Sequence, residues 1–174
     1  MKISTLFLVL IVIFSCNSKK EPQQVRMTEQ EVTERLTNAN KHRVQKESEE
    51  IEEFIKQHKF STERTGTGLR IQIYGRAKNG VSPVAHDEVQ IACKVFLLDG
   101  TLCYETDTTN PVAFKLGEGM QIRGLEEGIM TMIPGESARL IIPNHLAYGL
   151  SGDGDKIPPG AALFIDVKLL KLKK

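Results

Sequence analysis

Aromatic side chains are scarce in this chain of 174 residues. It contains no Trp, and its aromatic side chains are seven Phe and three Tyr. A binding site built from aromatic rings would therefore have few rings to use. Histidine is also rare, and none of the histidines has the spacing of metal ligands, so we predict no metal site. The four are His42, His58, His86 and His145.

The chain also lacks an excess of charge of either sign. It has 23 Lys and Arg against 22 Asp and Glu, a formal net charge of +1, and the basic residues form no long block. A protein that binds nucleic acid normally presents a basic patch or stripe to the phosphates. We therefore expect no nucleic-acid partner. The 40% of hydrophobic and 26% of charged residues are typical of a globular domain.

An apolar run long enough to cross a membrane is another missing feature. The run near the start, Leu6–Phe14, has nine residues, whereas a spanning helix needs about twenty. Lys2 precedes this run, so the pattern favours a secretory signal over a membrane anchor. Ser15–Cys16 then resembles the lipobox of bacterial lipoproteins, which predicts a signal peptide over residues 1–15 and a lipid on Cys16. The alternative is an ordinary signal peptide with an incidental Cys.

A lipid on Cys16 would anchor the protein to a membrane of the cell envelope. Asn17, rather than Asp, follows Cys16 and favours release to the outer membrane. We therefore expect a lipid-anchored protein at the outer membrane, facing the periplasm. Residues 16–27 are polar and contain one Pro, which is typical of a flexible tether.

The chain has three cysteines, and lipidation of Cys16 would leave Cys93 and Cys103. Their spacing excludes a CxxC redox motif, and no flanking residue would lower a thiol pKa, so a thiol oxidoreductase has little support. A hairpin turn at Asp99–Gly100 would pair Cys93 with a residue near 106 rather than with Cys103. We therefore expect both thiols to stay reduced.

Residues 28–60 have the pattern of a helical spacer. Thr28 and Glu31 are spaced as in a capping box, and apolar residues recur among many charged ones as far as about Lys59. The resulting apolar stripe is thin. It could pack on the following domain or on a second copy of the chain, or the helix could be solvated. The sequence leaves these possibilities open, and with them the oligomeric state.

Residues 61–174 predict an α+β domain, an antiparallel twisted sheet wrapped on one short helix. Asp99–Gly100 is a strong hairpin signal, and the helix is expected within residues 120–132, where Ile122, Leu125 and Ile129 share one helical face. After a linker, six segments have the alternation or β-rich composition of strands. They are 69–74, 88–98, 101–106, 112–116, 137–143 and 162–172.

Two segments of this domain carry a family resemblance. They are QIRGLEEGIMTMIPGESARLIIPNHLAYG, residues 121–149, and IPPGAALFIDVKLLKL, residues 157–172. With the Asp-Gly hairpin, they resemble the FKBP-type peptidyl-prolyl cis-trans isomerases over about residues 66–172. Tyr104, in place of the usual Asp, and the lipoprotein signal are similar to the gliding-motility-associated FKBP lipoproteins, a subgroup of that family.

The resemblance implies an enzyme that needs no nucleophile, metal or cofactor, because prolyl isomerisation breaks no bond. The X–Pro amide resists rotation by about 18–20 kcal/mol because of its partial double-bond character. Twisting the amide removes the resonance and reduces charge separation, so a dry apolar pocket favours the twisted form over the planar one. A hydroxyl and backbone N–H groups suffice to position the peptide carbonyls.

The family's site residues can be carried over to matching positions of this chain. The resemblance makes Tyr148 the hydroxyl that hydrogen-bonds a ligand carbonyl and Ile122 the residue whose backbone N–H contacts the ligand. Ile157 keeps an apolar position at the pocket rim, and Leu125 stands where the family commonly has a Trp. The other substrate-binding positions with a changed side chain are Cys93, Cys103, Tyr104, Val112 and Ile165.

The changed positions leave two functions open. Each large-to-small change removes contact area worth roughly 1.5–3 kcal/mol when a side chain is fully buried, and a looser grip on proline should reduce catalysis. The loop over the pocket also differs, since it carries Asp153 and Lys156. One function is an isomerase that acts on proline-containing, unfolded or partly folded envelope proteins. The other is a noncatalytic chaperone or binding module. The retained Tyr148 and Ile122 favour the isomerase.

Overall fold

The computed structural model describes residues 28–174. The predicted signal peptide, the lipid on Cys16 and the tether lie outside these residues. The chain divides into two compact units, Met1–Thr37 and Asn38–Lys174, and the division falls within the first helix. The domain boundary predicted between residues 60 and 61 stays a prediction.

The first helix, α1 (Glu29–His58), begins at the capping box that the sequence predicts. The backbone N–H of Thr28 donates to Glu31 Oε2 at 2.8 Å, and the backbone N–H of Glu31 donates to Thr28 Oγ1 at 3.3 Å. These bonds satisfy N–H groups that have no acceptor within the helix. Lys59 follows with φ 55, in the left-handed region, which ends the helix. Within residues 28–174, neither α1 nor any other helix has the length and apolar character needed to cross a membrane.

The last turns of α1 pack against the sheet. Ile51, Phe54 and Ile55 are buried in one apolar cluster with Ile141. For the part of the helix that belongs to Asn38–Lys174, the structure therefore shows packing on the following domain, which is one of the three roles that the sequence left open.

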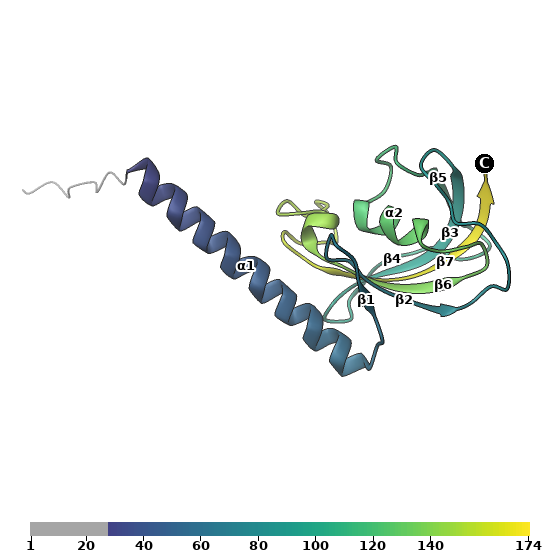
Figure 1. Ribbon diagram of the computed structural model, residues 1–174, viewed down its shortest axis with the longest axis horizontal. Coiled ribbons are helices and arrows are strands. Elements are labelled where there is room, and N and C mark those ends of the chain that lie inside the picture. Colours follow the sequence, from purple (N-terminus) through teal and green to yellow (C-terminus); the bar gives the residue numbers. More distant parts are fainter. Residues whose placement is uncertain (1–27) are drawn as a thin grey trace, which may run out of the picture. The chain divides into compact units, whose positions relative to one another are not determined.

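Seven strands of the described chain form one antiparallel sheet in the order β1-β2-β6-β7-β3-β4, and β5 pairs with β3. The short helix α2 (Arg123–Met130) lies over one face of this curved sheet (Figure 1). This arrangement confirms the predicted α+β class. The strands are β1 (Glu63–Arg64), β2 (Arg70–Gly75), β3 (Glu88–Leu97), β4 (Leu102–Glu105), β5 (Val112–Lys115), β6 (Ser137–Ile142) and β7 (Leu163–Lys173).

The hairpin between β3 and β4 has the predicted register. The backbone N–H of Thr106 donates to the carbonyl of Cys93 at 2.8 Å, which confirms the pairing expected for that cysteine. Gly100 has φ 90, a conformation that favours glycine. Asp99 Oδ1 accepts the backbone N–H of Thr101 at 2.9 Å and stabilises the turn.

Two glycines let α2 approach the sheet closely. A Cβ atom at Gly124 would lie 2.3 Å from Cγ2 of Ile142, and one at Gly128 would lie 2.6 Å from Cδ1 of Leu140. A larger residue at either position would force the side chain of Ile142 or Leu140 to move. The helix, which is shorter at both ends than the predicted segment, thereby buries Leu125 to 3% exposure.

The two helices contact opposite faces of β6. Leu140 and Ile142 face α2, whereas the intervening Ile141 packs with the last turns of α1, because successive side chains of a strand alternate between faces. The main apolar core lies on the α2 side.

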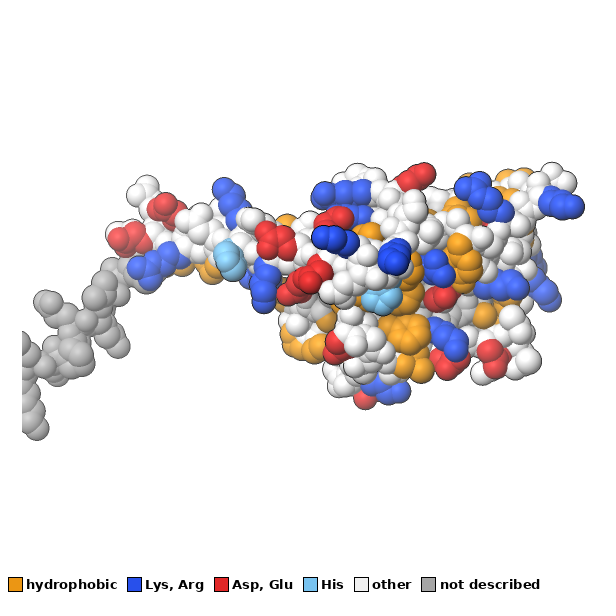
Figure 2. Space-filling model, turned by 90° about the horizontal axis from the view of Figure 1, so that it is seen from below, with side chains coloured by type: hydrophobic (Ala, Val, Ile, Leu, Met, Phe, Trp, Pro, Cys, Tyr) orange, Lys and Arg blue, Asp and Glu red, His pale blue; other side chains and the backbone are white. Residues whose placement is uncertain are grey.

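Charged side chains of both signs are interspersed on the domain surface seen in Figure 2. Their mixture fits the near-zero net charge of the sequence. This face presents no continuous basic stripe of the kind that follows a phosphate backbone.

Candidate active site

Eight of the nine substrate-site positions implied by the resemblance lie in one apolar cluster under α2. They come from β3, β4, β5, α2, β7 and the loop before β7, which are distant in sequence. The sheet register and the close approach of α2 bring them together. The eight are Cys93, Cys103, Tyr104, Val112, Ile122, Leu125, Ile157 and Ile165.

These eight side chains fall into two groups by burial, which we call the floor and the rim. The floor consists of Cys103, Leu125, Ile157 and Ile165, whose exposed fractions are 3%, 3%, 2% and 1%. The rim consists of the partly buried residues Cys93, Tyr104, Val112 and Ile122. The floor side chains are almost entirely shielded from water, and a dry apolar environment is what the proposed isomerisation mechanism needs.

Ile122 occupies the position before the first residue of α2. Its backbone is extended, with φ −64 and ψ 142, and its carbonyl accepts the N–H groups of Leu125 and Glu126 at 3.1 and 3.2 Å. The N–H groups at the start of a helix have no acceptor within the helix. The local structure therefore places Ile122 where its N–H could meet a ligand carbonyl.

Tyr148 is the ninth position, and it lies on the loop after the 3-10 turn η1 (Asn144–Leu146). Its side chain is 38% exposed, and the preceding Ala147 packs against the apolar cluster. Burial, followed by the negative charge of Asp153, raises the pKa of the Tyr148 hydroxyl. The hydroxyl is therefore protonated at neutral pH and can donate a hydrogen bond to a peptide carbonyl.

Tyr104 and Asp153, two of the positions that differ from the family, contact each other. The Tyr104 hydroxyl donates to Asp153 Oδ2, while Asp153 Oδ1 accepts the backbone N–H groups of Asp155 and Ile157 at 2.9 and 2.8 Å. The hydrogen bond from Tyr104 is the main cause of the lowered pKa of Asp153. The same bond, with burial and the Asp153 charge, raises the pKa of Tyr104 to about 12.

Lys156 adds a second tie between this loop and β4. Its Nζ donates to the carbonyl of Cys103 at 3.0 Å and lies 5.0 Å from the centre of the Tyr104 ring. Tyr104, Asp153 and Lys156 therefore form one set of contacts between β4 and the loop. Sequence reasoning missed this pairing, although both members stood out as departures from the same family pattern.

The two thiols are free in the structure. Burial is the main cause of a raised pKa for both Cys93 and Cys103. Cys93 also lies beside Thr106, whose Oγ1 is 3.7 Å from its sulfur. Protonated thiols are weak nucleophiles, so at neutral pH these side chains serve as small apolar groups in the pocket.

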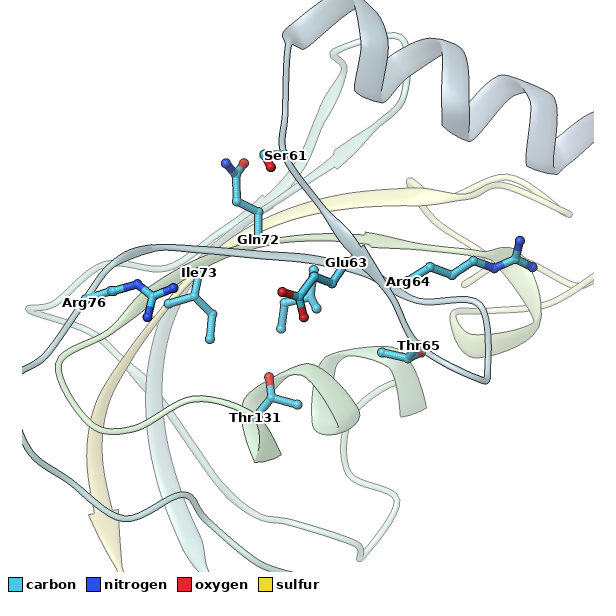
Figure 3. Close-up of a pocket in the computed structure, with 9 residues that line it drawn as sticks. Ser61, Glu63, Arg64, Thr65, Gln72, Ile73, Arg76 and Thr131 are labelled. Atoms are coloured by element: carbon cyan, nitrogen blue, oxygen red, sulfur yellow. The ribbon is translucent and has the colours of Figure 1, made fainter.

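A separate hollow of about 530 Å³ lies beside β2, and Thr131 at the end of α2 lies across it from Glu63 and Ile73 (Figure 3). Polar and charged side chains make up most of its lining. It shares Ile71 and Ile73 with the apolar cluster, but none of the nine substrate-site positions lines it. This hollow is therefore too polar to hold a proline ring. Its lining residues are Ser61, Glu63, Arg64, Thr65, Ile71, Gln72, Ile73, Arg76 and Thr131.

The described part of the chain contains no candidate metal site. From Thr28 onward, no three or more His, Cys, Asp or Glu side chains are grouped so that they could hold a metal ion.

The sheet, the single covering helix and the dry apolar site agree with the match to known families. Residues 80–170 match the family described as FKBP-type peptidyl-prolyl cis-trans isomerase. The match covers more than half of the chain. The chain therefore belongs to the FKBP-type peptidyl-prolyl cis-trans isomerase family.

Individual relatives extend this comparison. The chain is 32% identical over 165 residues to the probable FKBP-type peptidyl-prolyl cis-trans isomerase FkpA of Neisseria meningitidis, covering 86% of this chain and 59% of that protein. It is 46% identical over 67 residues to FK506-binding protein 2B of Rhizopus delemar, covering 38% of this chain and 32% of the relative. The crystal structure of FkpA from Escherichia coli matches with a TM-score of 0.65 and 29% identity, covering 85% of this chain and 74% of that one. The chain thus spans less than two thirds of the two sequence relatives.

Proposed function

We propose that this chain is a peptidyl-prolyl cis-trans isomerase that acts on unfolded or partly folded polypeptides in the cell envelope. The observation that carries the proposal is the apolar cluster, whose four floor side chains are no more than 3% exposed. Ile122 lies at the rim of this cluster, and Tyr148 follows a residue that packs on it. Membership of the family supports the same activity.

The proposed mechanism follows from the chemistry of the X–Pro amide. The uncatalysed exchange takes roughly tens to hundreds of seconds. Leu125 and Ile157 would hold the proline ring in a dry environment, while the Tyr148 hydroxyl and the Ile122 N–H bind the flanking carbonyls. The twisted amide has less charge separation than the planar amide, so removal of water lowers the barrier. No proton needs to be transferred and no covalent intermediate is formed.

A noncatalytic binding or chaperone module is the second function to test. Leu125 and Cys103 favour it, because both are smaller than the aromatic residues that the resemblance places there. Both side chains are almost fully buried, so little of either is exposed for contact with a proline ring. Such a site could hold apolar segments of a client without accelerating rotation.

One experiment separates the two functions. The full-length protein, purified in a mild detergent, is added to a short Xaa–Pro peptide, and the cis-to-trans relaxation of the peptide is followed. An isomerase shortens the relaxation time, and Ile122→Asp, which places a charge beside the dry floor, removes the effect. Leu125→Trp raises the activity if the pocket is merely loose.

The opposite result supports the second function. A wild-type protein that leaves the relaxation unchanged, yet suppresses aggregation of an unfolded client, is a binding module rather than an isomerase. The envelope location and the lipid on Cys16 are supported by the N-terminal sequence and are tested separately below.

A further inference from the structure

Glu47 of α1 is a buried acidic side chain outside the residues that match the family. It is 8% exposed, and its Oε1 accepts the backbone N–H of Asn144 at 2.6 Å. Residues 80–170 carry the family match, so Glu47 reaches the domain from a preceding element. A buried carboxylate is costly unless it receives strong hydrogen bonds. An acidic residue on a helix surface usually serves solubility, but the buried Glu47 side chain cannot, so its contact with Asn144 needs another explanation.

Asn144 forms the backbone hydrogen bonds that hold the loop containing Tyr148. It begins the turn η1, and Pro143 before it provides no side-chain hydrogen bond to cap the turn. The carbonyl of Asn144 accepts the backbone N–H groups of Ala147 at 3.0 Å and Gly149 at 2.8 Å. These two residues flank Tyr148 on either side. Asn144 therefore links the two: its N–H donates to Glu47, and its carbonyl accepts the N–H groups on both sides of Tyr148.

We propose that Glu47 is a positioning residue of the active site. Through Asn144, its carboxylate fixes the turn that presents the Tyr148 hydroxyl to the substrate carbonyl. The inference rests on the proposed isomerase function. It assigns to α1 a part in catalysis that its sequence, a charged helix with a thin apolar stripe, does not suggest.

Charged and polar side chains around Glu47 bond to other groups rather than to its carboxylate. Arg70, which is 4% exposed, lines the same small hollow of about 70 Å³, but its Nε and Nη2 donate to Glu52 Oε1 at 3.0 and 2.6 Å. His145 also lines this hollow, and its Nε2 lies 3.0 Å from the carbonyl of Thr67. Arg64 is the remaining charged residue of the lining. Arg70 and His145 thus have hydrogen-bond partners of their own.

The kinetic test uses the full-length protein and the peptide assay described above. Glu47→Ala should lower kcat/KM by up to about tenfold, because it acts through the one hydrogen bond of the Tyr148 hydroxyl and cannot cost more than the loss of that bond. Glu47→Gln should recover most of the activity, because the amide oxygen can accept the same bond. Glu50→Ala is the matched control, since Glu50 is an exposed acid of the same helix that pairs with Lys46.

A double-mutant cycle separates positioning from general destabilisation. If Glu47 acts through the tyrosine, Glu47→Ala should change kcat/KM less than about twofold in a Tyr148→Phe background. Glu52→Ala removes a different contact between α1 and the domain, and should lower stability without this coupling to Tyr148. An undiminished effect of Glu47→Ala in the Tyr148→Phe background would overturn the proposal.

Amide hydrogen exchange supplies a readout that does not require activity. The Gly149 N–H should exchange faster in Glu47→Ala than in wild type, Glu47→Gln or Glu50→Ala. Equal protection in all four proteins refutes the positioning role, even if the protein is an active isomerase. Faster exchange in a protein that leaves the peptide unchanged keeps the structural link and rejects the isomerase function.

Discussion

Tyr104 and Asp153 are two positions that differ from the family pattern and contact each other. The resemblance places an Asp at position 104 and a different residue at 153, whereas here the acid stands in the loop and the phenol on the strand. The longer Tyr side chain reaches across to the loop carboxylate, which also binds two loop N–H groups. In this chain the two changed positions are therefore joined by a hydrogen bond.

The pKa of Tyr104 predicts a pH dependence of stability. Its folded pKa of about 12 exceeds the ordinary value of 10.0, so the folded chain retains a proton that the unfolded chain loses first. The stability from this bond is fully present below pH 10 and is lost as pH rises to about 12. Denaturant unfolding of wild type and Tyr104→Phe should give midpoints whose difference is constant up to pH 9 and shrinks above about pH 10. A constant difference up to pH 11.5 would show that the bond contributes nothing.

Tyr148 should make a modest contribution to catalysis. Tyr148→Phe removes one positioning hydrogen bond, worth about 0.5–1.5 kcal/mol, so kcat/KM should fall about two- to tenfold. Tyr74→Phe is a matched control, because it removes a hydroxyl that donates to Asp166 at 2.7 Å, outside the apolar cluster. Equal losses in the two variants would mean that the Tyr148 hydroxyl does not contact the substrate.

At the scale of elements, α1 should be necessary for a stable domain. A chain of residues 61–174 lacks Ile51, Phe54 and Ile55, which cover one face of the sheet, and Glu52, the partner of the buried Arg70. We expect its free energy of unfolding to be at least about 3 kcal/mol below that of residues 38–174. Denaturant titration of both chains measures the difference. Equal midpoints with equal slopes would show that the helix contributes no stability.

The sequence predicts some elements of this fold well and others poorly, for physical reasons. The β3–β4 register follows from Asp99 and Gly100, because a tight turn fixes which residues pair. The contact between Glu47 and Asn144 spans 97 residues, and it depends on where a helix docks. A thin apolar stripe predicts a helix but does not identify its partner. Tyr104 and Asp153 were singled out separately, but their contact depends on the path of a loop.

For the whole molecule, the N-terminal sequence predicts membrane attachment through a lipid on Cys16. Cys16→Ser should give a protein that takes up no labelled fatty acid and remains either unprocessed or free of membranes. Cys93→Ser, which changes a cysteine of the folded domain, should leave labelling unchanged. Labelling that persists in the Cys16→Ser protein would show that the lipobox interpretation is wrong.

The position of β7 within the sheet governs when the domain can fold. This strand is the last of the seven in the described part of the chain, yet it lies between β6 and β3 and pairs with both. While the chain emerges from a ribosome or a translocation pore, β2 and β6 on one side and β3 on the other have no strand to join them. Only the arrival of residues 163–173 closes the sheet. The domain must therefore fold after its synthesis rather than during it, from partners distant in sequence, and its folding should be slow for its size.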